Sequence, residues 1–216
     1  MAAVKLHYIY DPLCGWCYGA IPLTRVAQEI SGLTLVLHGG GMMTGSNSRK
    51  ITAEWHDYVE PHDRRIAEIT GQPFGVAYYE GLLRDTRILL DSAPPIAAIL
   101  AAEQIDGKGL AMLHQLQHAH YVEGLEISNN AVLRHCAQII GLNSDDFTCE
   151  FLFIRAESLS QHIHASRELL QKVGGSGFPT FAIEDVQGNL RLLPVEQYSG
   201  RSEQWRQLLT QWVSEH

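Results

Sequence analysis

The hydrophobic pattern at the start of the chain predicts a β-α-β unit. Residues Val4–Tyr10 are rich in β-branched and aromatic side chains and end at Asp11-Pro12, which indicates a buried strand followed by a turn. Apolar residues then recur at helical spacing from Ile21 to Ile30, until Gly32 ends the pattern. The run Leu33–Leu37 predicts a second short strand. A helix between two such strands implies parallel pairing with a right-handed crossover.

The middle of the chain has a different pattern. A glycine-rich stretch at residues 39–48 suits a domain junction or a loop that lines a site. From about Ile51 to Ala156 the periodicity is helical, and no convincing pair of strands interrupts it. The segments Ser128-Asn129-Asn130 and Asn143-Ser144-Asp145-Asp146 carry capping residues ahead of apolar periodic runs. We therefore expect an all-helical block, with its clearest helices at Ile96–Gln104, Leu110–Val122 and Asn130–Ile140.

The last sixty residues return to a mixture of helices and strands. Ser158–Val173 predicts a helix, and Phe178–Ile183 predicts a strand that opens with a proline. A hairpin loop at residues 185–189 leads into a strand at Leu190–Val195, and an amphipathic helix follows at Ser202–Val213. Without the helical block, the order of elements is β-α-β and then α-β-β-α, which predicts an α/β fold.

Charge and hydropathy exclude some classes of function. The 16 basic and 24 acidic residues give a net charge of −8, which argues against nucleic acid as a partner because phosphate binding needs a basic surface. No apolar stretch approaches the roughly 20 residues that cross a bilayer, so no membrane partner is expected. Met1 is followed almost at once by the first strand, without a charged and then apolar leader, so we expect a cytoplasmic protein.

Two of the four cysteines form the pair Cys14-Gly15-Trp16-Cys17, directly after a predicted strand and directly before a predicted helix. A thiol at a helix N-terminus meets unpaired N–H groups that favour the reactive thiolate. A second sulfur three positions on can close a disulfide with the first, so the pair can carry electrons without a cofactor. The alternative is half of a zinc site, but no second pair with this spacing exists, and we favour redox chemistry with no metal.

The order of elements and two motifs resemble a known family. The segment Asp11-Pro12-Leu13-Cys14-Gly15-Trp16-Cys17-Tyr18-Gly19, the helical insertion and the segment Gly177-Phe178-Pro179-Thr180 together resemble the DsbA-like thiol-disulfide oxidoreductases, and most of all the FrnE-like cytoplasmic branch, which is described as predicted protein-disulfide isomerases. The resemblance covers essentially the whole chain. It implies a thioredoxin-like domain at residues 1–42 and 157–216 that carries a large all-helical insertion domain at residues 43–156.

The redox interpretation gives each cysteine a role. We expect Cys14 to be the nucleophile, exposed at the helix end, and Cys17 to be the more buried thiol that resolves the mixed disulfide. The resemblance further implies that the Phe178-Pro179 bond is cis and faces the dithiol, so that the backbone of Phe178 can pair with an extended substrate. Trp16 is expected to shape the approach of a peptide, and Met42 to border the site. Gly15-Trp16 differs from the Gly-Pro of thioredoxin and the Pro-His of periplasmic DsbA proteins, so no strongly oxidising potential is inferred.

The expected function is thiol-disulfide exchange on protein or peptide substrates, as an isomerase or reductase, with glutathione as a further candidate partner. One alternative is a glutathione-dependent enzyme for small molecules with the same fold, but such relatives generally have Ser in place of Cys14 and lack the second cysteine. Another alternative is a non-enzymatic module that binds peptides or zinc. The redox potential, the client protein, the oligomeric state and the choice among oxidase, isomerase and reductase stay open.

Three further features leave alternatives. Asp11 suits either a turn or a proton relay to the buried thiol. Cys136 and Cys149 are expected to be buried and inert, and a regulatory bridge between them is the alternative. His114 and His118 share a helix face, where a polar face is favoured over a metal site because the zinc-hydrolase glutamate is absent.

Overall fold

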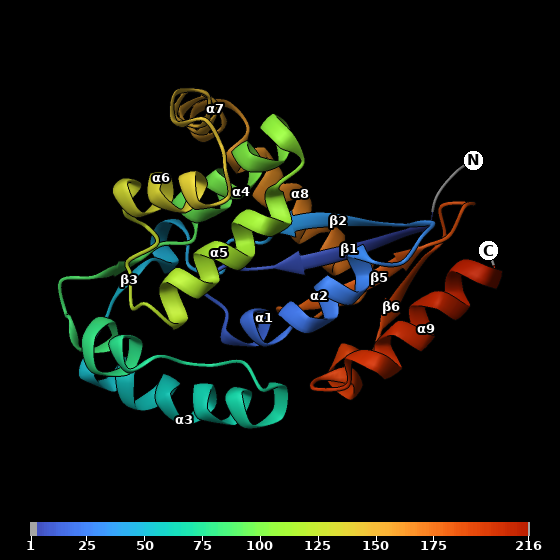
Figure 1. Cartoon of the computed structure of the whole chain (residues 1–216), viewed down its shortest axis with the longest axis horizontal. Helices are drawn as coiled ribbons and strands as arrows, with labels where there is room; N and C mark the ends of the chain where they lie inside the picture. The colour runs from blue at the N-terminus through green and yellow to red at the C-terminus, as the bar shows by residue number, and fades with distance from the viewer. Residues whose placement is uncertain (1–3, 216) are drawn as a thin grey trace.

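A computed structural model describes residues 4–215, which form a mixed α/β fold (Figure 1). The main sheet has the strand order β2-β1-β5-β6. Its strands are β1 (Val4–Tyr10), β2 (Leu33–Gly39), β5 (Thr180–Glu184) and β6 (Leu190–Leu193). Strand β1 pairs in parallel with β2 and antiparallel with β5, and β5 pairs antiparallel with β6. The predicted β-α-β unit and the predicted C-terminal hairpin are both confirmed. Residues 1–3 and 216 of the predicted thioredoxin-like domain lie outside the described residues.

Alternating side chains of β1 show which helices cover each face of the sheet. The hydroxyl of Tyr8 donates to the carbonyl of Cys17 over 3.2 Å, and the ring of Tyr8 stacks on Phe181 with a centroid distance of 4.5 Å. Its neighbour His7 points to the other face, because successive strand residues alternate, and hydrogen-bonds His38 over 2.9 Å. Helices α1 (Gly15–Gly19), α2 (Ile21–Gln28) and α9 (Ser202–Glu215) therefore belong to the first face, and α8 (Leu159–Lys172) to the second.

The helical segment after the cysteine pair is divided in two. Helix α1 ends at Gly19, and α2 begins at Ile21 after a single residue, Ala20. Pro22 occupies the first turn of α2, where its missing N–H has no partner to lose. The short α1 thus carries Cys17 as a separate turn, and the periodic run predicted from Ile21 corresponds to α2.

The insertion contains most of the helices. They are α3 (Ala53–Thr70), α4 (Ala93–Asp106), α5 (Gly109–Tyr121), α6 (Asn130–Ile139) and α7 (Ser144–Glu157), with short turns η1 (Gly45–Asn47), η2 (Ala77–Gly81) and η3 (Leu82–Arg84); a further turn, η4 (Val195–Tyr198), precedes α9. The side chains of Asn129 and Asn143 cap α6 and α7, which confirms the predicted caps.

The expectation of an all-helical insertion is wrong in one place. Strands β3 (Arg49–Lys50) and β4 (Leu89–Leu90) form an antiparallel ladder within it. Strands of two residues are too short to show an alternating pattern, so the sequence carries no signal for this pairing. The domain boundaries at residues 42 and 157 stay a prediction.

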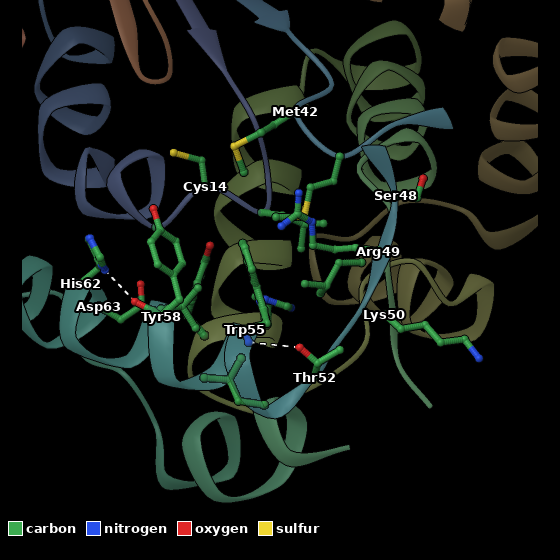
Figure 2. A pocket seen from close by; sticks show the side chains of 18 of the residues that line it. Cys14, Met42, Ser48, Arg49, Lys50, Thr52, Trp55, Tyr58, His62 and Asp63 are labelled. Atoms are coloured by element: carbon green, nitrogen blue, oxygen red, sulfur yellow. Dashed lines mark hydrogen bonds between the residues drawn. The ribbon is translucent and has the colours of Figure 1, made fainter. Parts of the chain in front are cut away.

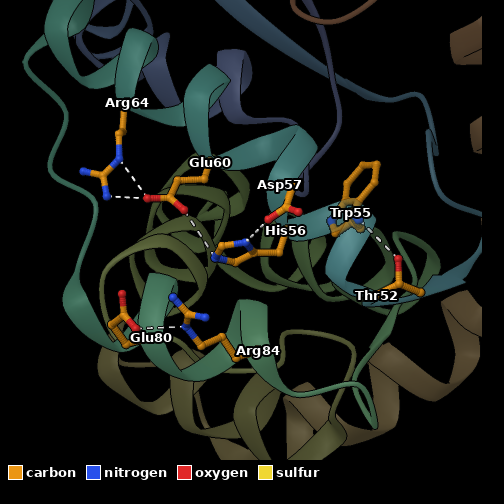
Figure 3. Close-up of polar contacts among 8 residues, drawn as sticks. All are labelled: Thr52, Trp55, His56, Asp57, Glu60, Arg64, Glu80 and Arg84. Carbon is orange, nitrogen blue, oxygen red and sulfur yellow. Dashed lines mark hydrogen bonds and ion pairs between the residues drawn. The ribbon is translucent and has the colours of Figure 1, made fainter.

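Helix α3 brings the insertion to the redox motif. The side chain of Thr52 caps it by accepting from the amide of Trp55 over 3.2 Å. Along the helix, Glu60 pairs with Arg64 and with His56, the latter over 3.3 Å (Figure 3). Its inner side buries Asp63 and Ile66, and the helix packs on α1. No helix within residues 4–215 has the length and apolar content needed to cross a bilayer.

Candidate active site

The two cysteines of the redox motif lie at the end of the loop that follows β1. Cys14 is the residue before α1, and its carbonyl accepts the amide of Tyr18 over 3.1 Å. Cys17 follows within α1, and both thiols are free. Cys17 is the more buried of the two, as predicted. The expected exposure of Cys14 is wrong: its side chain is only 8% exposed, because its sulfur turns toward the loop before β5 and the cleft walls surround it.

That loop supplies the second motif of the site. The thiol of Cys14 donates to the carbonyl oxygen of Phe178 over 3.3 Å. The peptide bond between Phe178 and Pro179 is cis, which confirms the geometry that the resemblance implied. The two motifs identified in the sequence therefore meet in space.

The environment of Cys17 keeps its sulfur protonated. Burial raises the pKa of Cys17 well above its ordinary value, and the neighbouring thiol of Cys14 raises it further. The amide of Asp11 donates to the sulfur over 3.5 Å, which lowers this pKa but is outweighed by burial. Cys17 is therefore a neutral thiol at neutral pH.

The carboxyl group of Asp11 organises the surrounding loops. One oxygen accepts from the amide of Leu13 over 2.9 Å and from the hydroxyl of Ser92 over 2.9 Å, and the other accepts from the amide of Met42. Burial raises its pKa to about 6, although these hydrogen bonds oppose the shift. Asp11 therefore makes the turn contact that one alternative held, and the proton relay to Cys17 stays a prediction. Its contact with Cys17 is made by its backbone amide, while its carboxyl group binds loop residues.

A glycine-rich loop between β2 and the insertion borders the site and is fastened from α8. The guanidinium of Arg167 donates to the carbonyl of Gly40 over 2.8 Å, to the carbonyl of Gly41 and to the hydroxyl of Thr44 over 3.3 Å. The amide of Gly40 also donates to the carbonyl of Tyr10 over 2.8 Å. These bonds fix the loop that ends in Met42.

Beside Cys14 lies a cleft of about 950 Å³. The thioredoxin-like part contributes Cys14, Trp16 and Met42, and α3 and β3 contribute the opposite wall (Figure 2). That wall includes Trp55, Tyr58, His62, Asp63, Arg49 and Lys50. The guanidinium of Arg49 lies over the ring of Trp55 at 4.8 Å from its centroid, so one positive charge is held in place within the wall.

A second cleft, of about 980 Å³, lies on the other side of Trp16. It is lined by Trp16, by Phe178 and Pro179, and by residues of β6 and the segment that follows, including Leu192. Trp16 is 37% exposed and borders both clefts. Five of the six predicted site residues line these two clefts, which share Trp16, and the sixth, Cys17, is buried.

Sequence reasoning missed the wall contributed by the insertion. Arg49 and Lys50 directly follow the glycine-rich stretch that was predicted to line a site, and this proximity is the one signal that pointed to them. Asp63 and Tyr78 carry no such signal, because they reach the site only through the packing of α3 and η2.

The remaining cysteines are free and lie in different environments. Cys136 is buried, as expected, and burial raises its pKa to about 11. The expectation of a buried Cys149 is wrong. The buried face of α7 is formed by Phe147, Phe151 and Ile154 at helical spacing, and Cys149 lies off that face.

The paired histidines of α5 are satisfied polar residues. His114 hydrogen-bonds the hydroxyl of Thr24 over 2.9 Å, and burial lowers its pKa to about 4. His118 pairs with Glu123 over 3.3 Å. Within residues 4–215, no group of three or more His, Cys, Asp and Glu side chains is arranged to hold a metal ion.

The chain is similar to several proteins of known structure. The cytosolic disulfide reductase DsbM from Pseudomonas aeruginosa is 48% identical, with a TM-score of 0.92 over 98% of this chain and 100% of that one. A second structure of DsbM, with GSH, gives 48% identity and a TM-score of 0.90 over 97% of this chain and 99% of that one. A Nitrosomonas europaea protein, described provisionally as a protein disulfide isomerase, is 27% identical, with a TM-score of 0.81 and 99% of both chains covered.

More distant similarity shows the fold alone. A 2-hydroxychromene-2-carboxylate isomerase shares 16% identity at a TM-score of 0.62 over 98% of this chain and 99% of that one. No protein-family model matches the sequence, and no curated protein matches it significantly. The identity and coverage of DsbM, together with the Cys14-Gly15-Trp16-Cys17 motif, fix the family and its thiol-disulfide chemistry. The chain belongs to the DsbA-like thiol-disulfide oxidoreductases of the thioredoxin superfamily.

Proposed function

We propose that the protein reduces disulfide bonds through Cys14 and Cys17, and that a small thiol of the glutathione type restores its dithiol. The observation that carries the proposal is the contact of 3.3 Å between the Cys14 sulfur and the Phe178 carbonyl, at the boundary of two clefts. A nucleophile held against the backbone that precedes Pro179 can react with a disulfide whose chain lies along that backbone.

The reaction begins with the Cys14 thiolate, which attacks one sulfur of the substrate R–S–S–R′. A bond forms between Cys14 and the R sulfur, the S–S bond breaks, and R′–S⁻ leaves with the electron pair and takes up a proton. Cys17 then loses its proton and attacks the Cys14 sulfur, which releases R–S⁻ and leaves a Cys14–Cys17 disulfide. Two small thiols reduce that disulfide and are themselves oxidised to a disulfide.

The two clefts suit different halves of this cycle. The first cleft carries Arg49, whose charge complements the carboxylates of a glutathione-like thiol, while Lys50 lines its edge with its side chain directed away from Cys14 (Figure 2). The structure of DsbM with GSH supports this assignment by similarity. The second cleft offers the Phe178-Pro179 backbone and the apolar Leu192 on edge strand β6, which suit an extended polypeptide. In this proposal Trp16 separates the two, and Met42 closes the first.

The same similarity supports a location and a net direction for the reaction. DsbM is named a cytosolic disulfide reductase, and we propose a cytosolic location for this chain. Disulfides are kept reduced in that compartment, which favours reduction as the net reaction. Reshuffling of wrongly paired disulfides uses the same first step, and the experiment below separates the two activities.

The test measures reduction of a disulfide-bonded protein by glutathione and reactivation of a scrambled one, with and without the protein. We expect Cys14→Ser to abolish both activities and Cys17→Ser to accumulate a covalent adduct with substrate that dithiothreitol releases. Cys149→Ser is the matched control, because this exposed thiol lies outside both clefts. Full activity in Cys14→Ser would overturn the proposal. If the protein reactivates the scrambled substrate faster than it reduces the disulfide-bonded one, it is an isomerase.

A further inference from the structure

The wall of the first cleft contains a buried acid that the cycle above does not use. Asp63, on α3, is 5% exposed and lines the same cleft as Cys14. The hydroxyl of Tyr78 donates to Oδ2 of Asp63 over 2.8 Å. Within residues 4–215, no donor reaches its other oxygen, Oδ1. Oδ1 is not fully buried but keeps contact with the open space of the cleft, where a group that enters can reach it.

The free oxygen lies against the redox motif itself. A Cβ atom placed on Gly15, the residue after Cys14, would be 2.7 Å from Oδ1 of Asp63. Only glycine at this position lets the carboxyl group come so close to the backbone of the motif. Tyr121, Cys14 and Asp63 line the same cleft.

The groups around Asp63 come from every element that packs there. On α3 its neighbour is His62, and η2 contributes Tyr78 and Tyr79. Helix α5 contributes His120 and Tyr121, with His120 buried and its Nδ1 without a partner among the described residues. Strand β3 contributes the cations Arg49 and Lys50 to the same cleft. Burial among these rings raises the pKa of Asp63 to about 6, while the Tyr78 hydrogen bond and the nearby His62 lower it.

We propose that Asp63 is the proton acceptor and donor for thiol exchange at Cys14. The inference rests on the proposed function, because it assigns a step within that cycle. The Asp63 carboxylate takes the proton of the incoming thiol R–SH, and the resulting R–S⁻ attacks the disulfide at Cys14. The S–S bond breaks, the electron pair goes to the leaving sulfur, and the proton released by Asp63 balances the one that the leaving sulfur takes up.

Atoms and electrons balance in the same way in the two steps that reduce the Cys14–Cys17 disulfide. In the first, the leaving sulfur is that of Cys17, and the products are a Cys14–R mixed disulfide and a Cys17 thiol. In the second, a further R–S⁻ attacks the R sulfur of that mixed disulfide, Cys14 leaves and is protonated, and R–S–S–R is released. A carboxylate that accepts the proton of the incoming thiol is useful because thiols have an ordinary pKa of about 8.5 and are mostly protonated at neutral pH. General acid and base groups accelerate such steps by roughly 10²–10⁴-fold.

The experiment follows the reduction of the oxidised protein by reduced glutathione, from pH 5 to pH 8, in the wild type and in Asp63→Asn. The wild-type rate constant is divided by that of Asp63→Asn. This ratio cancels the effect of glutathione's own ionisation, which is the same in both reactions. We expect the ratio to be near one at pH 5 and to rise through pH 6 to about 10 or more at pH 7. Asp57→Asn, an exposed residue of the same helix, is the matched control and should keep the ratio at one throughout. A ratio that stays flat overturns the proposal.

Tyr78→Phe gives a second readout that a purely structural role would not move. It removes the hydrogen bond that lowers the pKa of Asp63, so the rise in rate should move to higher pH. If Asp63→Asn fails to fold, this shift decides the question: a profile that moves upward supports the proposal, and an unchanged one overturns it. If glutathione does not reduce the wild type at all, the proposed function fails first, and that result is distinct from a wild type that reacts with a flat ratio.

Discussion

The thiol of Cys14 donates to the carbonyl oxygen of Phe178 over 3.3 Å, although 164 positions separate the two residues in the chain. Phe178 is positioned in turn by a third segment, because its ring lies directly on Gly40, in the loop after β2. That loop is tied to β1 through the carbonyl of Tyr10 and to α8 through Arg167. The position of the carbonyl that accepts the Cys14 hydrogen bond therefore depends on contacts that lie outside both sequence motifs.

Gly40→Ala should disturb this relationship directly. A Cβ atom at position 40 would lie 2.2 Å from Cε1 and 2.3 Å from Cζ of Phe178, so the ring must move and shift its own carbonyl. Overpacking of this kind costs about 1–3 kcal/mol of unfolding free energy. We expect urea denaturation to show that loss and the rate of disulfide reduction to fall severalfold. Gly81→Ala is the control, because no atom lies within 4 Å of a Cβ there.

Arg167 should be a positioning residue of the same loop. Its guanidinium reaches Gly40, Gly41 and Thr44 through a planar set of donors that lysine cannot reproduce. Arg167→Met should broaden the methyl NMR signal of Met42 and lower the turnover of small disulfides about tenfold. Arg167→Lys should recover only part of the loss, since it restores one donor. A Met42 signal that is unchanged in Arg167→Met would show that Arg167 does not hold this loop in position.

Asp11 should make the stability of the protein depend on pH. Its pKa rises from 3.8 to about 6 on folding, so the folded state favours the protonated acid. The contribution to stability is therefore present below pH 4 and is lost as the pH rises through 6. In Asp11→Asn this dependence disappears. The unfolding free energy of the variant should improve relative to the wild type by about 2 kcal/mol between pH 4 and pH 7.

Asp11→Asn loses the hydrogen bond from the Met42 amide, which lowers its unfolding free energy by the same amount at every pH. The slope of the unfolding free energy against pH is therefore the quantity to compare. Urea denaturation at several pH values measures it. Asp57→Asn removes an exposed carboxylate and serves as the control. A slope in Asp11→Asn that matches the wild type would show that another group carries the pH dependence, with the buried acid Asp63, whose pKa is also raised to about 6, as the first to examine.

The parts of the fold that follow local rules could be predicted from the sequence. Periodicity located β1, α2 and α9, and asparagine caps located the starts of α6 and α7. The site was predictable as far as it rests on two motifs, Cys14 to Cys17 and Phe178-Pro179. The cationic wall of β3, the buried Asp63 and the low exposure of Cys14 arise from packing between distant segments. Residue spacing along one segment carries no information about such contacts.

The contact between α3 and α1 explains why glycine follows Cys14, and Gly15→Ala tests it. The added Cβ would lie 2.7 Å from Oδ1 of Asp63 and 2.9 Å from Cδ1 of Ile66. The end of Ile66 can turn away, but Tyr78 holds the carboxyl group of Asp63 in place. Alanine gains up to about 1 kcal/mol over glycine within a helix, and overpacking costs about 1–3 kcal/mol, so we expect a net loss of about 1 kcal/mol by urea denaturation.

A double-mutant cycle assigns that loss to one contact. In an Asp63→Ala background the carboxyl group is absent, so Gly15→Ala should become neutral or stabilising, and the two substitutions should be coupled by about 1–2 kcal/mol. Gly81→Ala, combined with Asp63→Ala, should be additive, because its Cβ has no neighbour within 4 Å. If Gly15→Ala costs the same in both backgrounds, the close approach is to Ile66 alone, and Asp63 does not restrict the residue after Cys14.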